Sequence, residues 1–223
     1  MKISLNYIRL VALGNFNPAI VTPDFLNEVC ELNLGEPTDQ SSPIIPVHKR
    51  LKFKNITFNI DLGRLEISQT GVANIHEVKI KDMFDVYYER LPYTPLSAVG
   101  VNINCELPKT DVLIEKTVNP KTYLDFFNAR AIEIAEQSLQ TQDEKTWLSS
   151  NYSIESVRSL TRRIQTTKKK DSLNINYNYE AGGLDQNKER LKLLLSGYKE
   201  FCDEFLNFVK FLGGMNASLE SNN

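Results

Sequence analysis

An alternation of apolar and polar residues that leads into a helical pattern occurs twice in the chain, and this repeated order constrains the fold most. In the first copy, residues 56–61 alternate between Ile or Phe and polar side chains, and 65–67 begin a return strand after a turn near Gly63. The spacing of apolar residues then predicts a helix over 75–91. The first copy is therefore expected to be an antiparallel hairpin followed directly by a helix.

The second copy has the same order of elements. Residues 173–180 alternate between apolar or aromatic and polar side chains, a Ser/Thr-rich partner strand is expected over 154–167, and a long helix begins near Gln186. The residues of the two copies do not align well. The repeat therefore either reflects two related structural halves or is simply the common strand–strand–helix arrangement.

From this order we predict an α+β protein of two similar, closely packed halves, each an antiparallel sheet packed against one or two long helices. The strand-rich first half is expected over 1–118 and includes the helix near 75–91. The second half, over 119–214, is expected to hold a helix, a basic hairpin and the long final helix. Residues 215–223 are expected to form a disordered tail.

Several elements carry more specific expectations. Residues 3–13 are apolar at both alternating sets of positions, which predicts a central strand buried on two sides. Asn74 is expected to cap the 75–91 helix, with Glu77 placed as in a capping box. A second helix is expected to open at 119–120, with an apolar stripe running to Leu139, and to join the halves. The final helix is expected to start with Asp185 as its cap and to stop at 213–214.

Composition limits the function classes. A net charge of −2 and a pI near 5.8 give no overall attraction to nucleic acid or membranes. Three scattered cysteines do not make a disulfide framework, no apolar run is long enough to span a membrane, and no signal-peptide pattern occurs. We therefore expect a cytoplasmic protein, microbial or viral, that makes no membrane contact.

The sequence contains little catalytic chemistry. The two histidines lack metal-ligand spacing, no phosphate-binding or nucleophile motif occurs, and the cysteines lie in apolar stretches typical of buried packing. The exception is Asp61 followed by Glu77 and Lys79, which is similar to the acid, acid-x-Lys pattern of metal-dependent nucleases. Glu77 has a competing interpretation as a helix-capping residue. The sequence thus favours a protein without catalytic residues, metal or cofactor.

A basic hairpin is the better candidate for binding. Its cationic residues are those expected of a surface that follows a phosphate backbone, namely Arg158, Arg162, Arg163, Lys168, Lys169 and Lys170. The alternative is a charged edge strand whose lysines prevent edge-to-edge association. The neighbouring Tyr177 and Tyr179 share the alternation of Leu173 and Ile175, which indicates core packing.

The final helix is the candidate protein interface. Its apolar residues cover more than the usual third of the helix circumference, so Leu195, Phe205 and Phe208 are candidates for contact with another chain. The alternative is that this helix packs between the sheet and the helix opening at 119–120.

The order of elements resembles a sporadically distributed group of uncharacterised prokaryotic proteins built from strand-rich segments that are each followed by a helix. Residues 95–104 are similar to that group's strand ending in a glycine and asparagine pattern, and 173–179 with the final helix are similar to its second unit. The layout also resembles the sheet-plus-helix arrangement of SecB-like export chaperones. The resemblance implies a layout and carries no site residues.

Together these features favour a non-enzymatic protein that binds another protein or itself through the final helix. The first alternative is a nucleic-acid-binding accessory protein that uses the basic hairpin. The second is a metal-dependent nuclease built on Asp61, Glu77 and Lys79.

Overall fold

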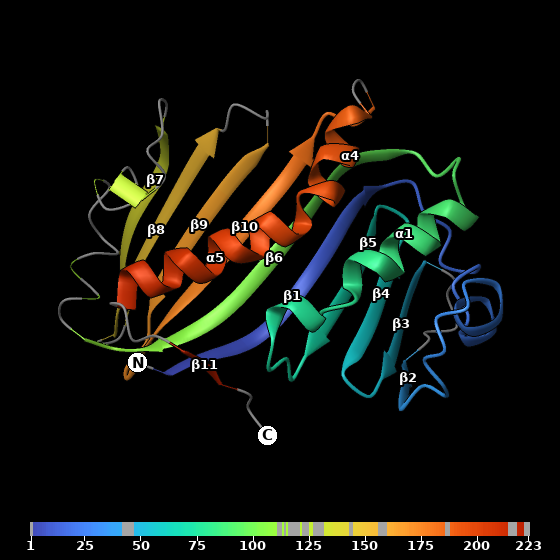
Figure 1. Ribbon diagram of the computed structural model, residues 1–223, viewed down its shortest axis with the longest axis horizontal. Coiled ribbons are helices and arrows are strands. Elements are labelled where there is room, and N and C mark those ends of the chain that lie inside the picture. Colours follow the sequence, from blue (N-terminus) through green and yellow to red (C-terminus); the bar gives the residue numbers. More distant parts are fainter. Residues whose placement is uncertain are drawn as a thin grey trace.

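One large sheet with helices on a single face forms the body of the protein, and it is an α+β fold, as predicted (Figure 1). The computed structural model describes residues 2–41, 47–110, 113, 115, 121, 125–126, 132–142, 145–155, 160–185, 188–213 and 218–220. The strands within these residues form a single sheet.

The sheet is antiparallel except at one short edge. Its strands are β1 (Lys2–Gly14), β2 (Asp39–Ser41), β3 (His48–Phe53), β4 (Ile56–Asp61), β5 (Arg64–Thr70), β6 (Leu96–Pro108), β7 (Ile132–Gln142), β8 (Lys145–Glu155), β9 (Thr161–Lys168), β10 (Ser172–Gly182) and β11 (Ser218–Glu220). They follow the order β2-β3-β4-β5-β1-β6-β10-β9-β8-β7, and β11 pairs in parallel with the start of β1. Because β6 pairs with β10, the sheet runs without interruption across the boundary predicted near residue 118.

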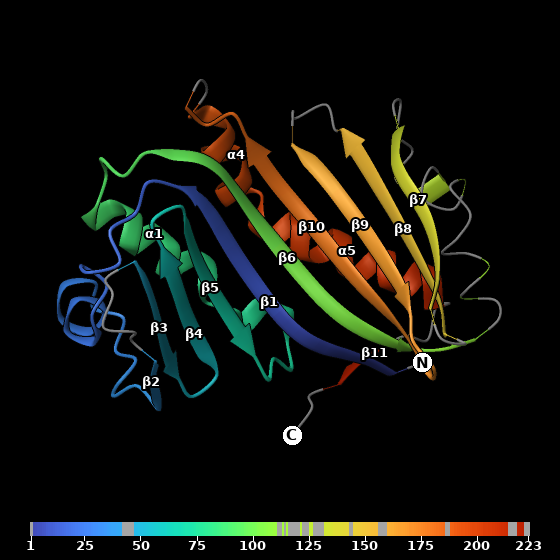
Figure 2. The same ribbon diagram turned by 180° about the vertical axis from the view of Figure 1, so that it is seen from behind.

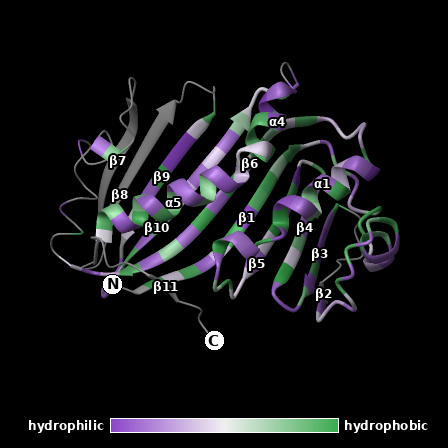
Figure 3. Cartoon of the chain, viewed as in Figure 1, coloured by the Kyte–Doolittle hydropathy of each residue, from purple (hydrophilic) through white to green (hydrophobic). Residues whose placement is uncertain are grey.

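The helices lie on the same side of the sheet and cover its apolar face (Figures 1 and 2). They are η1 (Phe25–Val29), η2 (Ile75–Glu77), α1 (Ile80–Arg90), α4 (Glu189–Ser196) and α5 (Tyr198–Gly213). Along β10 every second residue from Leu173 to Ala181 is buried, and the residues between them are partly exposed. Figure 3 shows the same alternation of hydrophobic and hydrophilic positions in the central strands. The strand period of two therefore separates the core face from a polar face.

Strand β1 is central, as predicted, but it is buried on one face only. Its pairing with β6 shifts register between Leu5 and Tyr7, which leaves Asn6 as an extra residue. This bulge moves Ile8, like Leu5 before it, onto the core face. The apolar residues that alternate with Ile8, among them Val11, then point to the opposite face, which no described helix covers. Burial on two sides is therefore a wrong prediction.

The two helices predicted after the hairpins are both interrupted. Asn74 caps as expected, because its side chain accepts a hydrogen bond from the His76 amide at 3.0 Å, but the capped turn is the short η2 and α1 starts only at Ile80. The final helix divides at Gly197 into α4 and α5. Its first residue is Glu189 with Lys188 at the cap position, so the predicted Asp185 cap is wrong.

The helix predicted from 119–120 through Leu139 differs most from the structure. Residues 132–142 form β7, which pairs antiparallel with β8, while most of 116–124 lies outside the described residues. Ile132 and Ile134 are two residues apart, which is the period of a strand. The prediction of a helix applied a helical period to this segment instead. In the segment predicted to be a disordered tail, Ser218–Glu220 instead forms β11.

The three cysteines are free and buried, in agreement with the packing role expected for them. Burial raises the pKa of the Cys30 and Cys105 thiols, and it raises the pKa of Cys202 to about 12. The thiolates that react with disulfide reagents are therefore scarce near neutral pH.

We expect all three thiols to react with Ellman's reagent about a hundredfold more slowly in the folded chain than in denaturant, because reaction requires local opening. The absorbance at completion in denaturant should correspond to all three thiols. A thiol that reacts at full rate in the folded protein would contradict the burial seen here.

Candidate functional site

The face of the sheet opposite the helices carries a continuous array of polar side chains, called here the open face. No described helix lies over it (Figure 2). Its members come from alternate positions of neighbouring strands, so the antiparallel register aligns them in rows that run across the sheet. One such row joins Ser68, Arg9, Asn102, Asn178 and Arg163.

Asparagines dominate the part of the open face that is formed by β1, β6 and β10. They are Asn6 on β1, Asn102 and Asn104 on β6, and Asn174, Asn176 and Asn178 on β10. Asparagine is depleted in strands, because its side chain competes for backbone hydrogen bonds and packs poorly on a pleated surface. Six asparagines on three adjacent strands therefore lower the strand propensity at the centre of the sheet, which points to a role other than folding.

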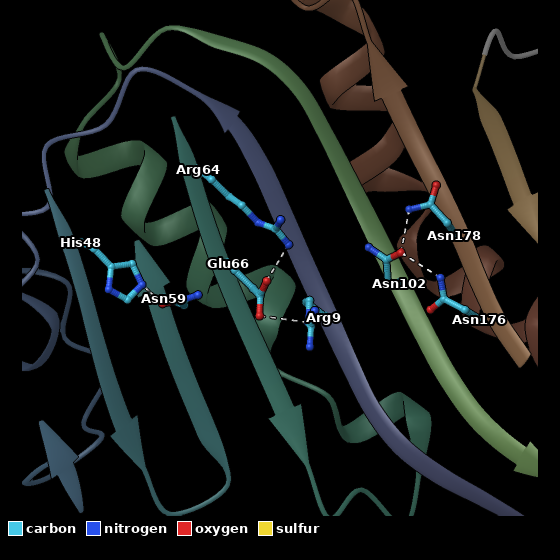
Figure 4. A network of polar contacts seen from close by, with 8 residues as sticks. All are labelled: Arg9, His48, Asn59, Arg64, Glu66, Asn102, Asn176 and Asn178. Carbon is cyan, nitrogen blue, oxygen red and sulfur yellow. Dashed lines mark hydrogen bonds and ion pairs between the residues drawn. The ribbon is translucent and has the colours of Figure 1, made fainter. Parts of the chain in front are cut away.

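The amides bond to one another across the strands. Asn6 Nδ2 donates to Asn104 Oδ1 at 2.7 Å, and Asn104 and Asn174 exchange hydrogen bonds of 3.0 and 2.9 Å. Asn178 Nδ2 donates to Asn102 Oδ1 at 3.0 Å (Figure 4). Within the described residues, Oδ1 of Asn176 and Oδ1 of Asn178 are buried and have no hydrogen-bond partner. An amide array on an uncovered face can exchange hydrogen bonds with a bound molecule.

Next to the amides lies a three-residue ion cluster. Glu66 on β5 is 9% exposed and lies between Arg9 Nε at 3.0 Å and Arg64 Nη2 at 2.7 Å (Figure 4). The Arg9 guanidinium also lies 4.4 Å from the centre of the Tyr7 ring, a cation–π contact. At the outer strands His48 Nε2 lies 2.6 Å from Asn59 Oδ1. The cluster holds its arginines in fixed positions on the open face.

Two further acids of the open face also contact bases. Glu180 forms an ion pair of 3.0 Å with Arg163, and Glu106 contacts Lys169. The charged groups beside the asparagines are therefore paired, whereas Arg50 and Lys52 on β3 are exposed cations. The part of the face around the asparagines offers many hydrogen bonds and little net charge.

The structure divides the basic hairpin predicted as an anion-binding site. Arg162 points to the helix side of the sheet, where its Nε and Nη2 lie 2.5 and 2.8 Å from the Glu204 carboxylate on α5. The same carboxylate accepts a hydrogen bond from the Tyr177 hydroxyl, and Arg162 lies over the Tyr179 ring. Burial, followed by the neighbouring Glu204 carboxylate, raises the pKa of Tyr177, which stays a neutral donor.

The remaining cations of that prediction do not gather. Arg163 lies on the open face beside Glu180, Lys169 contacts Glu106, and Lys170 is exposed in the turn. Arg158 lies outside the described residues, as does the side chain of Lys168. Strand β9 lies between β10 and β8 and is not an edge strand, so the alternative of a charged edge strand is wrong.

The final helix uses its apolar residues inside the molecule. Phe205 and Phe208 are fully buried and pack around the Tyr177 ring at 5.8 and 5.6 Å between centroids, while Leu195 is partly buried against the core. This placement agrees with packing onto the sheet, the alternative to a protein interface. Tyr177 and Tyr179 are core residues, as the alternation indicated.

The residues of the nuclease pattern lie apart. Asp61 ends β4 and binds the Gly63 amide at 2.7 Å, whereas Glu77 follows the far end of β5 and contacts the Asn74 side chain. The seven residues of β5 separate them. Among the described residues, no group of three or more His, Cys, Asp and Glu side chains is placed to hold a metal ion.

The asparagines at the polar positions of 99–106 and 173–180 are visible in the sequence, but neither segment by itself shows that they form one site. The missing information was the strand order, since β6 and β10 are more than sixty residues apart in sequence yet pair directly. Both segments alternate asparagine with apolar residues, and this shared pattern was the signal that indicated their pairing.

Comparisons with known proteins show no family for this chain. No family model matches, and no curated protein matches. A solved structure of DynU16, from the dynemicin biosynthetic locus, aligns with 92% of this chain and 99% of its own, at 10% identity and a TM-score of 0.28. Similarity at that level carries no argument about fold or function. In the described part of the chain, no helix has the length and apolar content needed to cross a membrane.

Proposed function

We propose that this chain is a non-enzymatic binding protein whose docking surface is the open face, and that its partner is another protein. The observation that carries the proposal is the array of asparagines on the uncovered face. Each amide can both donate and accept hydrogen bonds, so the array can exchange several of them with the polar groups of a partner.

The size of the open face supports a macromolecular partner. From β3 to β9 the sheet has seven strands, and six spacings of about 4.8 Å give a width of about 29 Å. Residues 98–106 of β6 add a length of about 27 Å at 3.4 Å per residue. The resulting area of about 800 Å² is what one partner contributes to a standard protein–protein interface.

The distribution of polarity also fits a protein partner. Strand β1 places Tyr7, Val11 and Leu13 on the open face at the middle of the sheet, and Leu13 is 42% exposed. Amides and paired ions flank them on both sides. Protein interfaces usually have an apolar centre within a polar rim. The amount of polar surface here is typical of non-obligate complexes, whose partners are also stable separately.

Balanced charge argues against the nucleic-acid alternative. Affinity for nucleic acid comes mainly from cations that replace counterions on phosphates. Here Arg162 is bound to Glu204 on the other side of the sheet, and Arg9, Arg163 and Lys169 each contact a carboxylate. The exposed cations Arg50 and Lys52 lie on β3, near one edge of the sheet and away from the asparagines.

We also propose that the chain comprises two structurally similar halves that share the sheet. In support, β1 pairs with β5, the last strand of the run β3-β4-β5, and β6 pairs with β10, the last strand of the run β8-β9-β10. A helix follows each run on the same face, α1 after β5 and α4 after β10. This arrangement would centre the open face on the β1–β6 pair.

Site-specific photocrosslinking in the cells that make the protein tests the docking surface. We expect a photoreactive residue in place of Asn178, on the open face, to give a discrete adduct with one other protein. The same residue in place of Lys199, exposed on α5, should give no such adduct. Adding Val11→Lys to the Asn178 variant should reduce the adduct about tenfold or more, because it places a charge at the apolar centre.

Equal adducts from both positions, or none from Asn178, would refute the open face as the docking surface. An adduct with nucleic acid would restore that alternative. An adduct of this chain with itself would replace the separate partner by self-assembly. Circular dichroism of the Val11→Lys variant should match the wild type, because Val11 lies on the partly exposed face.

A further inference from the structure

A pocket lies between the end of α1, the loop that follows it and the start of α4. Its volume is about 370 Å³, within the range of sites that bind small molecules. It lies on the helix side of the sheet, so it is separate from the open face. Its walls come from the end of α1, residues 92–96, residues 184–185 and the start of α4.

The inner part of the pocket is apolar. Leu96, Leu184 and Leu191 line it and are themselves 8, 2 and 7% exposed. Tyr88 adds an aromatic wall, and its ring is stacked on Phe84 at 6.0 Å with an angle of 5° between the ring planes. A flat apolar group of a ligand would therefore meet aliphatic and aromatic surfaces together.

The walls are held in place by the backbone. The Pro95 carbonyl accepts a hydrogen bond from the Asn15 amide at 3.0 Å, and the Leu184 amide donates to the Ser97 carbonyl at 3.0 Å. Pro92 and Pro95 restrict the chain on either side of Tyr93. A preformed pocket needs little ordering when a ligand binds, which favours affinity.

The rim is polar and carries both signs of charge. Tyr93 is 95% exposed beside the pocket, and Asp185 and Lys188 are exposed on the opposite wall. Among the described residues neither Asp185 nor Lys188 forms an ion pair. Lys188 also occupies the cap position of α4, where the helix dipole adds to its attraction for an anion.

We propose that this pocket binds a small aromatic molecule that carries both a carboxylate and an ammonium group, the class to which aromatic amino acids belong. The ring would lie against Tyr88 and the two prolines. The carboxylate would pair with Lys188 at the start of α4 and the ammonium with Asp185. Opposite charges at one rim above an apolar interior match such a molecule better than a purely apolar or singly charged one.

Isothermal titration of the full chain with three related probes tests this. L-tryptophan has both charged groups, tryptamine lacks the carboxylate, and indole-3-propionate lacks the ammonium. We expect saturable binding that is tightest for L-tryptophan. Lys188→Ala should lower the affinity for L-tryptophan and for indole-3-propionate about fivefold, because an exposed ion pair contributes about that factor. The affinity for tryptamine should stay unchanged.

Asp185→Ala should lower the affinity for L-tryptophan and for tryptamine by about the same factor and leave the affinity for indole-3-propionate unchanged. Lys192→Ala is the matched control, because Lys192 is exposed on α4, pairs with Glu189 and does not line the pocket. All three replaced side chains are exposed, so the variants should fold as the wild type does. No saturable binding of any probe at millimolar concentration, or equal binding by all variants, would overturn the proposal.

Discussion

Replacing Phe208 by alanine is expected to lower the free energy of unfolding by about 3–5 kcal/mol, the loss found when a fully buried phenylalanine is truncated. Phe208 is 0% exposed, and its ring lies 5.6 Å from that of Tyr177 and 5.2 Å from that of Phe126. The loss combines transfer of the ring to water with the cavity left between α5 and the sheet. Urea denaturation followed by circular dichroism measures it.

Phe211→Ala provides the control on the same helix. Phe211 is 39% exposed, and its ring contacts that of Phe126. Removing the Phe211 ring should therefore lower the free energy of unfolding by only about 1 kcal/mol. Light scattering on both variants separates core from interface. A Phe208→Ala chain that keeps wild-type stability but changes its oligomeric state would show that Phe208 serves an interface, contrary to its burial.

The sequence predicted the elements whose periodicity is local. The 56–67 hairpin and the alternation of 173–180 appear as β4–β5 and β10, because the period of two in each reflects one apolar and one polar face. The cap at Asn74 was predicted too, since capping depends on residues within one turn. These elements were accessible to reasoning on single segments.

Other features depend on contacts between distant segments. The bulge at Asn6 exists only in the register of β1 against β6, and without it the apolar residues of β1 predict burial on two faces. Arg162 looked like a surface cation because its partner Glu204 lies forty-two residues away. Strand β7 has a different reason, because it pairs with β8, the next segment of the chain, and its local period of two was interpreted as helical.

The open face shows the same limit for function. Each asparagine is, by itself, an ordinary polar position of a half-buried strand. Only the order β1-β6-β10 turns Asn6, Asn104 and Asn174 into one hydrogen-bonded chain. Because this surface is made by strands from both predicted halves, it exists only when the whole sheet is formed. We therefore expect binding to be lost together with the fold, with no partial activity in either half alone.

Gly14→Ala is expected to destabilise the protein by about 3 kcal/mol, at the upper end of the cost of overpacking. Gly14 ends β1 and bonds through its amide to the Gly63 carbonyl at 3.0 Å. A Cβ at this position would collide with the Pro95 carbonyl oxygen and lie 3.1 and 3.3 Å from the Pro95 carbon and Leu96 Cα. These are backbone atoms, so no side-chain rotation relieves the clash.

Gly182→Ala is the matched control at the end of β10, because a Cβ there meets nothing within 4 Å. It should leave the free energy of unfolding unchanged or raise it by up to about 1 kcal/mol through lower entropy of the unfolded chain. Thermal unfolding of both variants measures the difference. Because Pro95 and Leu96 also line the pocket, Gly14→Ala should weaken the binding of L-tryptophan as well. Equal stability of the two variants would instead show that the Pro95 loop moves easily and that the pocket is not rigid.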